Sequence, residues 1–216
     1  MGVKERRERE KSETRDKILD AARELFVTEG YEGVSMRKVA DKIEYSPTAI
    51  YVHFADKNEL FRELCHQDYA RLAEVFQSSV MLTDPIERLK QIGAIYIDFG
   101  TRYPNHYKFM FMAPHPPHEP DEVDREMIGN PEMDAYAFLK WAVQQAINAD
   151  CFREELRDAE LISQTLWASV HGVISLHIAK GADPWVNWCP LTERAEMMLD
   201  ITLRGLMREV KTGKDE

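Results

Sequence analysis

Cysteine is scarce in this sequence, and the residues that would mark a membrane or secreted protein are absent. The 216 residues contain only Cys65, Cys151 and Cys189, far apart and without a CxxC pair. This odd number of separated thiols favours free cysteines in a reducing compartment over a disulfide framework or a cysteine zinc site. No run of eighteen apolar residues occurs, and the first residues, MGVKERREREKSE, lack the apolar segment of a secretory signal. We therefore expect a cytoplasmic protein with no membrane partner.

Catalytic sequence motifs are also missing. No GxSxG, phosphate-binding P-loop or HExxH motif occurs, and no segment alternates apolar and polar residues as a half-buried strand does. We expect an all-α protein that is not an enzyme and needs no cofactor.

The charge is unevenly distributed along the chain. The net charge is −10, yet residues 1–57 contain 12 basic and 12 acidic residues, and the remainder contains 16 basic and 26 acidic ones. A neutral N-terminal segment can bind phosphate when its basic side chains share one face. The acidic total therefore does not exclude DNA binding by this segment.

The N-terminal segment predicts four helices. Residues 4–17 are of mixed charge and are predicted to form a frayed arm, followed by a first helix with apolar residues at spacings of three and four up to Gly30, whose lack of a side chain permits a left-handed end. Ser35 is predicted to cap a second helix through Ile43 that buries Val39, Ala40 and Ile43. A short third helix is predicted over residues 47–53, because Ser46-Pro47 is a start signal. Asp56 and Glu59 resemble a capping box for a fourth helix ending near residue 76.

The short third helix has the chemistry of a DNA reader. Ile50 and Phe54 are four residues apart and can bury together, which would turn Thr48, Ala49, Tyr51 and His53 outward. A short helix on a rigid support fits the major groove, where hydroxyl and methyl groups contact base edges, while basic and hydroxyl groups contact phosphates. The predicted DNA-binding residues are Ser35, Arg37, Lys38, Ser46, Pro47, Thr48, Ala49, Tyr51, His53 and Lys57. The alternative is an ordinary helical bundle with a tyrosine and a histidine on its surface.

The rest of the chain predicts further helices. Proline and capping residues place them at 85–102, from Tyr103-Pro104 to about 112, at 131–149, at 158–180 and at 192–210. This gives about nine helices in all. Residues 113–130 are rich in proline and acidic residues and are predicted to form an exposed loop. We expect two domains: a helix-turn-helix DNA-binding domain with its N-terminal arm over 1–57, and a helical ligand-binding and dimerisation domain over 58–216.

Residues 18–61 resemble the tetracycline-repressor (TetR) family of bacterial transcriptional regulators. The resemblance rests on ILDAARELFVTEGYEGVSMRKVADKIEYSPTAIYVHFADKNELF, above all on Tyr51-Val52-His53-Phe54, with Lys57 and Leu60. It implies a homodimer that binds a palindromic operator and is released from it by a small-molecule effector. One departure is Glu44, which stands where many relatives have glycine in the turn; a left-handed glutamate would cost roughly 1 kcal/mol.

The C-terminal half carries a weaker resemblance. The segment LWASVHG, residues 166–172, resembles the Trp-His-Gly pattern of one TetR C-terminal subfamily. Helices 158–180 and 192–210 are candidates for half of an intersubunit four-helix bundle, with Gly172 at a close helix crossing. The second of them offers the apolar residues Met197, Met198, Ile201, Leu206, Met207 and Val210. The alternative is that the two helices only complete the core of one chain.

A ligand pocket is expected among the remaining helices. Its candidate lining residues are aromatic, with one histidine: Tyr96, Phe99, Tyr103, Tyr107, Phe109, Phe111, Trp141, Trp167 and His171. Apolar pockets with a few polar groups are usual for small molecules, although such residues are also typical of a plain core. His171 can be the polar group of the pocket or a core histidine with its hydrogen bonds satisfied.

Histidines and carboxylates gather in the proline-rich loop. Their spacing matches no standard zinc pattern, so we expect a solvated acidic loop and no metal. The residues concerned are His115, His118, Glu119, Asp121, Glu122 and Asp124.

The sequence is compatible with three functions. The leading one is a dimeric, ligand-responsive repressor. The second is a helical small-molecule binding protein with a vestigial DNA module, favoured only by Glu44 and the acidic total; it would lack salt-sensitive DNA binding. The third is an all-α enzyme that uses residues 106–126, which no spacing supports.

Overall fold

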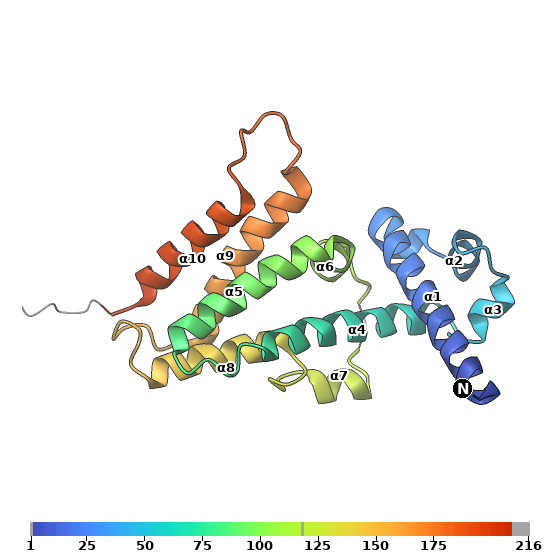
Figure 1. The fold of residues 1–216 in the computed structure, drawn as a ribbon, viewed down its shortest axis with the longest axis horizontal. Coiled ribbons are helices and arrows are strands. Elements are labelled where there is room, and N and C mark those ends of the chain that lie inside the picture. The colour runs from blue at the N-terminus through green and yellow to red at the C-terminus, as the bar shows by residue number, and fades with distance from the viewer. Residues whose placement is uncertain (1, 118, 209–216) are drawn as a thin grey trace, which may run out of the picture. The chain divides into compact units, whose positions relative to one another are not determined.

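The computed structural model describes residues 2–117 and 119–208, and within them the chain is all-α, as predicted (Figure 1). It forms two compact units: one contains the residues up to 69 together with 105–124, and the other contains 70–104 and the residues from 125 onward. The predicted boundary after residue 57 stays a prediction. The described helices are α1 Val3–Gly33, α2 Met36–Lys42, α3 Pro47–Tyr51, α4 Lys57–Gln77, α5 Pro85–Arg102, α6 Pro104–Phe111, α7 Glu122–Met127, α8 Ala135–Asn148, α9 Ala159–Lys180 and α10 Leu191–Leu206.

Helix α1 is longer than the sequence predicted. It begins at Val3, so residues 4–17 are helical and the prediction of a frayed arm is wrong. Exposed ion pairs four residues apart, Lys4–Glu8, Arg6–Glu10 and Arg9–Glu13, support these turns. Gly30 has a φ of 71° and kinks the helix where the sequence placed its end, after which helical turns continue to Gly33.

Helices α2 and α3 begin where their capping residues predicted. The Ser35 hydroxyl accepts the backbone N–H of Lys38 at 3.3 Å, and the Ser46 hydroxyl accepts that of Ala49 at 3.2 Å. Both bonds satisfy N–H groups that the first turn of a helix leaves unpaired. Val39 and Ala40 of α2 are fully buried, whereas Ile43 is only half-buried.

The first unit has aromatic and ionic groups in its interior. The ring of Phe61 packs edge-on against Phe26 of α1 and Phe109 of α6, with both pairs of ring centroids 5.2 Å apart. Beside them, Arg23 of α1 donates from Nε and Nη2 to the two carboxylate oxygens of Asp68 on α4, at 2.8 and 2.9 Å. Arg23 and Asp68 are 4% and 1% exposed, so this bidentate pair is buried and joins α1 to α4.

The second unit is built from α5, α8, α9, α10 and the end of α4. Its interior is mainly apolar, and one close crossing lies at Gly93 of α5, where an added Cβ would stand 2.5 Å from a methyl group of Leu199 on α10. A Cβ added at Gly172 meets nothing within 4 Å of the same chain, so the close crossing predicted there, as part of an intersubunit bundle, stays a prediction. Within the chain, the glycine at a close helix crossing is Gly93 of α5.

Several boundaries in the second half differ from prediction. The predicted loop 113–130 contains the short helix α7, and Met127 is buried. Helix α8 starts four residues later than expected, because Asp134 accepts the N–H groups of Tyr136 and Ala137 while Asn130 caps only a turn at Glu132. Helix α10 ends at Leu206, Met207 follows it, and Val210 lies outside the described residues.

The described cysteines are free thiols, as expected: Cys65 is buried, Cys151 is half-buried and Cys189 is exposed. Across residues 2–117 and 119–208, no helix is both long and apolar enough to span a bilayer.

Candidate nucleic-acid interface and ligand cavity

Helix α3 presents a polar face on an apolar base. Ile50 and Phe54 are 0% and 1% exposed, as predicted, and they anchor the helix in the unit. Thr48 is exposed and Tyr51 is 55% exposed, whereas Ala49 is half-buried. Two of the four side chains expected to face outward therefore form a free surface, and the preceding Ser46 and Pro47 extend it at the start of the helix.

Helix α2 lies next to α3 and adds a basic group at its first turn. Arg37 is largely exposed, its side chain at 83%, with only a loose ion pair of 3.9 Å to Asp41. Lys38 instead turns back: its Nζ donates to the carbonyl of Gly33 at 2.8 Å and pairs with Glu29. Of these two neighbouring cations, Arg37 is the one that extends toward solvent.

His53 and Lys57 are not free surface groups. His53 was expected to face outward but is half-buried, and its Nδ1 is among the described buried atoms that have no hydrogen-bond partner. Burial, and then the positive charges of Lys11 and Arg15, lower the pKa of His53 below its usual value. Lys57 donates from Nζ to the carbonyl of Tyr31 at 2.9 Å and lies 4.0 Å from the centre of its ring. Lys57 thus joins the start of α4 to α1, and His53 is half-buried at the end of α3.

The turn between α2 and α3 contains a left-handed glutamate. Glu44 has a φ of 60°, which confirms that it adopts the conformation that glycine has at low cost. The Tyr45 N–H donates to the carbonyl of Ala40 at 3.0 Å and closes the turn. The turn therefore has the backbone conformation that glycine favours, in spite of its sequence.

Two further large side chains beside α3, absent from the predicted DNA-binding residues, are exposed. Tyr45 is 37% exposed and Val52 is 68% exposed. They flank the helix at positions next to the Ser46 cap and to Tyr51. The sequence could have indicated both residues, because burial of Ile50 and Phe54 turns the neighbouring large side chains outward.

The second unit contains a cavity of about 30 Å³. It lies among α5, α8, α9 and α10, and Phe76 of α4 closes part of its wall. Only Tyr96 and Trp167 of the predicted lining residues reach it. The other lining residues are aliphatic apart from one glycine and one threonine: Leu89, Ile92, Gly93, Leu139, Leu166, Val170, Met198, Leu199, Thr202 and Leu203.

Two hydrogen bonds link Trp167, Tyr96 and His171 beside this cavity. The indole Nε1–H of Trp167 donates to the hydroxyl of Tyr96 at 3.0 Å, and the same hydroxyl lies 3.0 Å from Nδ1 of His171. Because the hydroxyl accepts from the indole, its own proton can be donated to Nδ1 of a neutral His171. Burial lowers the pKa of His171 and favours that neutral form. Tyr96 and Trp167 thus bring polar groups to a mainly apolar wall, and His171 lies behind them, outside the cavity lining.

The remaining candidate lining residues pack against other side chains and do not line this cavity. Phe99 packs against Tyr103 with the two rings tilted, and Trp141 packs on Phe138 and under the guanidinium of Arg88, in the second unit. Tyr107, Phe109 and Phe111 lie in the first unit, where Tyr107 and Phe109 are fully buried. The structure therefore does not bring the nine candidates together in one pocket.

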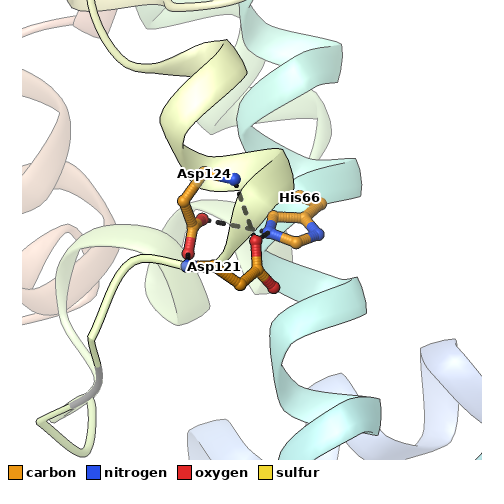
Figure 2. A group of neighbouring side chains, drawn as sticks. All are labelled: His66, Asp121 and Asp124. Carbon is orange, nitrogen blue, oxygen red and sulfur yellow. Dashed lines mark hydrogen bonds and ion pairs between the residues drawn. The ribbon is translucent and has the colours of Figure 1, made fainter.

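The acidic loop makes a contact that its sequence did not reveal. Asp124 Oδ1 lies 3.0 Å from Nε2 of His66 on α4, and Asp121 Oδ1 lies 3.8 Å from the same nitrogen (Figure 2). The pKa of Asp121 is lowered first by the backbone N–H of Asp124. The prediction of a solvated loop is wrong for these two residues, although Glu119 and Glu122 are exposed. His115 contacts the Phe109 carbonyl at 2.7 Å, and His118 lies outside the described residues.

Two short capped helices joined by a tight turn and backed by α1 and α4 define a helix-turn-helix protein. Residues 18–64 match the family model described as "Bacterial regulatory proteins, tetR family". Residues 89–201 match "Tetracyclin repressor-like, C-terminal domain". The chain belongs to the TetR family of bacterial regulatory proteins.

Individual relatives agree with this family. The chain is 44% identical over 66 residues to the HTH-type transcriptional repressor AcnR of Corynebacterium diphtheriae, which covers 31% of this chain and 35% of AcnR. It is 30% identical over 102 residues to the HTH-type transcriptional activator FasR of Mycolicibacterium smegmatis, 47% of each protein. These curated relatives are therefore matched over about a third to a half of their length.

A solved structure shows the same fold along most of the chain. The fatty acid degradation regulator FadR from Bacillus halodurans superimposes with a TM-score of 0.69 and 19% identity, over 90% of this chain and 97% of FadR.

Proposed function

We propose that this protein is a homodimeric transcriptional regulator that binds palindromic operator DNA and is released from it by a small apolar or aromatic effector. Residues 1–57 would bind DNA, and residues 58–216 would bind the effector and dimerise. The observation that carries the proposal is the exposed face of α3, where Thr48 and Tyr51 project from a capped helix anchored by Ile50 and Phe54. A short, rigidly supported helix with small and hydroxyl side chains suits the major groove.

The predicted DNA-binding residues divide into three roles under this proposal. Thr48, Ala49 and Tyr51 would face base edges and phosphates, and Arg37 would bind the DNA backbone, since its side chain extends into solvent. Ser35, Ser46 and Pro47 would start the two helices and direct their first N–H groups toward phosphate. Lys38 and Lys57 would act as positioning residues, because each donates to a backbone carbonyl of α1. His53 would do so through its half-buried ring.

Dimerisation is proposed through α9 and α10. Leu161 and Leu176 of α9 are 60% and 50% exposed, and Met197 and Ile201 of α10 are 66% and 63% exposed. Exposed apolar side chains in this number are typical of an interaction surface. A second copy packed on these faces would complete a four-helix bundle.

The effector is proposed to enter the cavity of the second unit. At about 30 Å³ the cavity has room for little more than water, whereas ligand pockets are about 300 Å³ or more. Binding would therefore require α5, α8, α9 and α10 to move apart. An effector that prefers this opened state would alter the spacing of two DNA-binding heads, about 34 Å apart on successive grooves, and so weaken operator binding.

The test begins with an operator duplex that the protein itself selects from random-sequence DNA. Its affinity is then measured by fluorescence anisotropy at several salt concentrations. Tyr51→Ala and Thr48→Ala should weaken binding by about tenfold each. Arg37→Ala should also reduce the salt slope by about one. Arg102→Ala is the matched control, because Arg102 is an exposed arginine with an i,i+4 aspartate partner on α5.

Two results would contradict the proposal. Variants of α3 that bind the selected duplex like the unaltered protein would show that α3 is not the reader. Binding of small molecules without any salt-sensitive DNA binding would favour the second candidate, a ligand-binding protein with a vestigial DNA module.

The dimer has its own test. Met197→Glu combined with Ile201→Glu should shift the sedimenting species from dimer to monomer and abolish cooperative binding to the two half-sites. Glu196→Ala, an exposed change on the same helix, should leave the dimer intact. A monomeric unaltered protein would contradict this part of the proposal.

A further inference from the structure

The first unit contains a group of metal-ligating side chains that DNA binding does not use. His66, Asp121 and Asp124 each offer one ligand atom, and the three atoms lie within 4.8 Å of one another. His66 comes from α4, while the two aspartates come from the residues at and before the start of α7 (Figure 2). All three are partly buried, with side chains 17%, 36% and 18% exposed in that order.

We propose that His66, Asp121 and Asp124 form a binding site for a divalent transition metal ion, with zinc as the probe. Zinc is bound by histidine nitrogen and aspartate oxygen at about 2.0–2.2 Å. Two donors at such lengths stand about 3.0–3.5 Å apart in tetrahedral or octahedral geometry. The separations from His66 Nε2, 3.0 Å to Asp124 and 3.8 Å to Asp121, require shifts of only a few tenths of an ångström.

The surroundings of the two carboxylates preset them for this role. The N–H of Asp121 donates to Oδ2 of Asp124 at 3.0 Å, and the N–H of Asp124 donates to Oδ1 of Asp121 at 2.9 Å. Arg62 approaches the other oxygen of Asp121, Oδ2, at 3.7 Å. The Asp124 oxygen that faces His66 is therefore free of these backbone bonds, and Asp121 Oδ1 retains a second lone pair.

Metal binding would have a defined chemical consequence. His66 would bind through Nε2 with its proton on Nδ1, and solvent would complete the coordination. The ion would replace a hydrogen bond between α4 and residues 121–124 by coordinate bonds. Because α4 follows directly after the helix-turn-helix, the site would stabilise the unit that contains the DNA-reading helix. This role goes beyond the proposed repressor function, and it would hold even if α3 bound no DNA.

The experiment uses the full chain with Cys189→Ser, which removes the exposed thiol as a competing ligand. After chelation and removal of the chelator, zinc is added in a calorimetric titration, and bound zinc is counted by elemental analysis. One zinc ion per chain and a rise in melting temperature are expected. His66→Gln and Asp124→Asn should each weaken binding by about tenfold or more. His115→Gln, a half-buried histidine elsewhere in the unit, should bind zinc unchanged.

The proposal is overturned if the stripped protein binds no zinc, or if His66→Gln binds it with unaltered affinity. If a variant fails to fold, paramagnetic cobalt replaces zinc in the unsubstituted chain. The site would be supported if the amide resonances of residues 66, 121 and 124 broaden at lower cobalt concentrations than all other resonances. Broadening centred elsewhere would overturn it.

Discussion

The two units of this chain are stabilised by different kinds of contact. The first buries the ion pair between Arg23 and Asp68, to which His106 adds a contact of 2.8 Å from Nδ1. The second has a mainly apolar interior, a small cavity, and apolar side chains exposed on α9 and α10. Buried charges tolerate few arrangements, since each needs its partner in place, whereas apolar contacts can slide and re-form.

This difference matches what each unit is proposed to do. A DNA reader must hold α3 in one orientation, and the bonds among α1, α4 and α6 in its unit favour that. A regulatory unit must pass between states, and a cavity beside a close helix crossing allows movement. Four predictions test the comparison, from the largest expected effect to the smallest.

Asp68→Ala should have the largest effect. It leaves the guanidinium of Arg23 buried without its bidentate partner, and removal of one partner of a buried pair costs about 3–5 kcal/mol. The free energy of unfolding, measured in urea, should fall by this amount. Asp98→Ala breaks an exposed pair with Arg102 and should change it by about 1 kcal/mol or less. Equal effects of the two changes would remove the contrast between buried and exposed pairs.

Gly93→Ala should come next. The added methyl group would stand 2.5 Å from Leu199, so α5 and α10 must separate or Leu199 must move. Overpacking of this kind costs about 1–3 kcal/mol, visible as a lower melting temperature. Gly172→Ala is the control, because its methyl group meets nothing within 4 Å of the same chain. A loss at Gly172 as large as at Gly93 would place another chain against α9.

Glu44→Gly should make the protein more stable. Glu44 has a φ of 60°, where a side chain costs about 1–2 kcal/mol, and the extra freedom of glycine in the unfolded chain cancels about 0.4–1 kcal/mol of the gain. A net gain of about 0.5–1 kcal/mol in urea unfolding is expected. Glu44→Ala keeps a Cβ and should give no such gain. Equal stabilisation by alanine would mean that charge, not backbone strain, is the cause.

The smallest effect concerns one histidine in each unit. The pKa values of His53 and His171 are both lowered, chiefly by burial, but Lys11 and Arg15 also act on His53. Both side chains should titrate below 6.5 in histidine NMR spectra. Salt of about 1 M screens charges beyond about 3 Å, so it should raise the pKa of His53 and leave that of His171 unchanged. Equal salt responses would contradict the assigned causes.

The lowered pKa values of His53 and His171 also determine how the stability of the protein changes as the pH falls. Each histidine binds its proton more weakly in the folded state than in the unfolded state. Their contribution to stability is therefore present above the unfolded pKa of about 6.5 and is lost as the pH falls through the folded values. His53→Gln and His171→Gln should each reduce the loss of stability between neutral and mildly acidic pH, measured by urea unfolding.

Local features of the sequence were sufficient for most of the fold. Ser35, Ser46-Pro47 and Asp158 mark their helix starts through hydrogen bonds to residues three positions away, so one sequence suffices to see them. At α8 two such signals compete, and the choice of Asp134 over Asn130 depends on how the preceding turn folds. Helix α7 was missed because its short segment has the composition of a loop.

The site was less predictable, since orientation depends on distant partners. Lys38 and Lys57 have side chains suited to phosphate, but Glu29, Gly33 and Tyr31 of α1 hold them. His66 meets Asp124 across 58 residues of chain, and no spacing pattern encodes such a contact. The aromatic residues proposed for one pocket are divided between two units, because composition alone does not distinguish a pocket from a core.

The stability of the first turns of α1 depends on ionic strength. Its first turns carry exposed pairs that each contribute about 0.2–0.5 kcal/mol, and dissolved ions weaken them. A helix of this length is about 46 Å long, at 1.5 Å per residue. As ionic strength rises, its first ten residues would unwind before the part that Arg23 fixes. The first turns of α1 are therefore expected to be the part of this helix whose stability depends most on ionic strength.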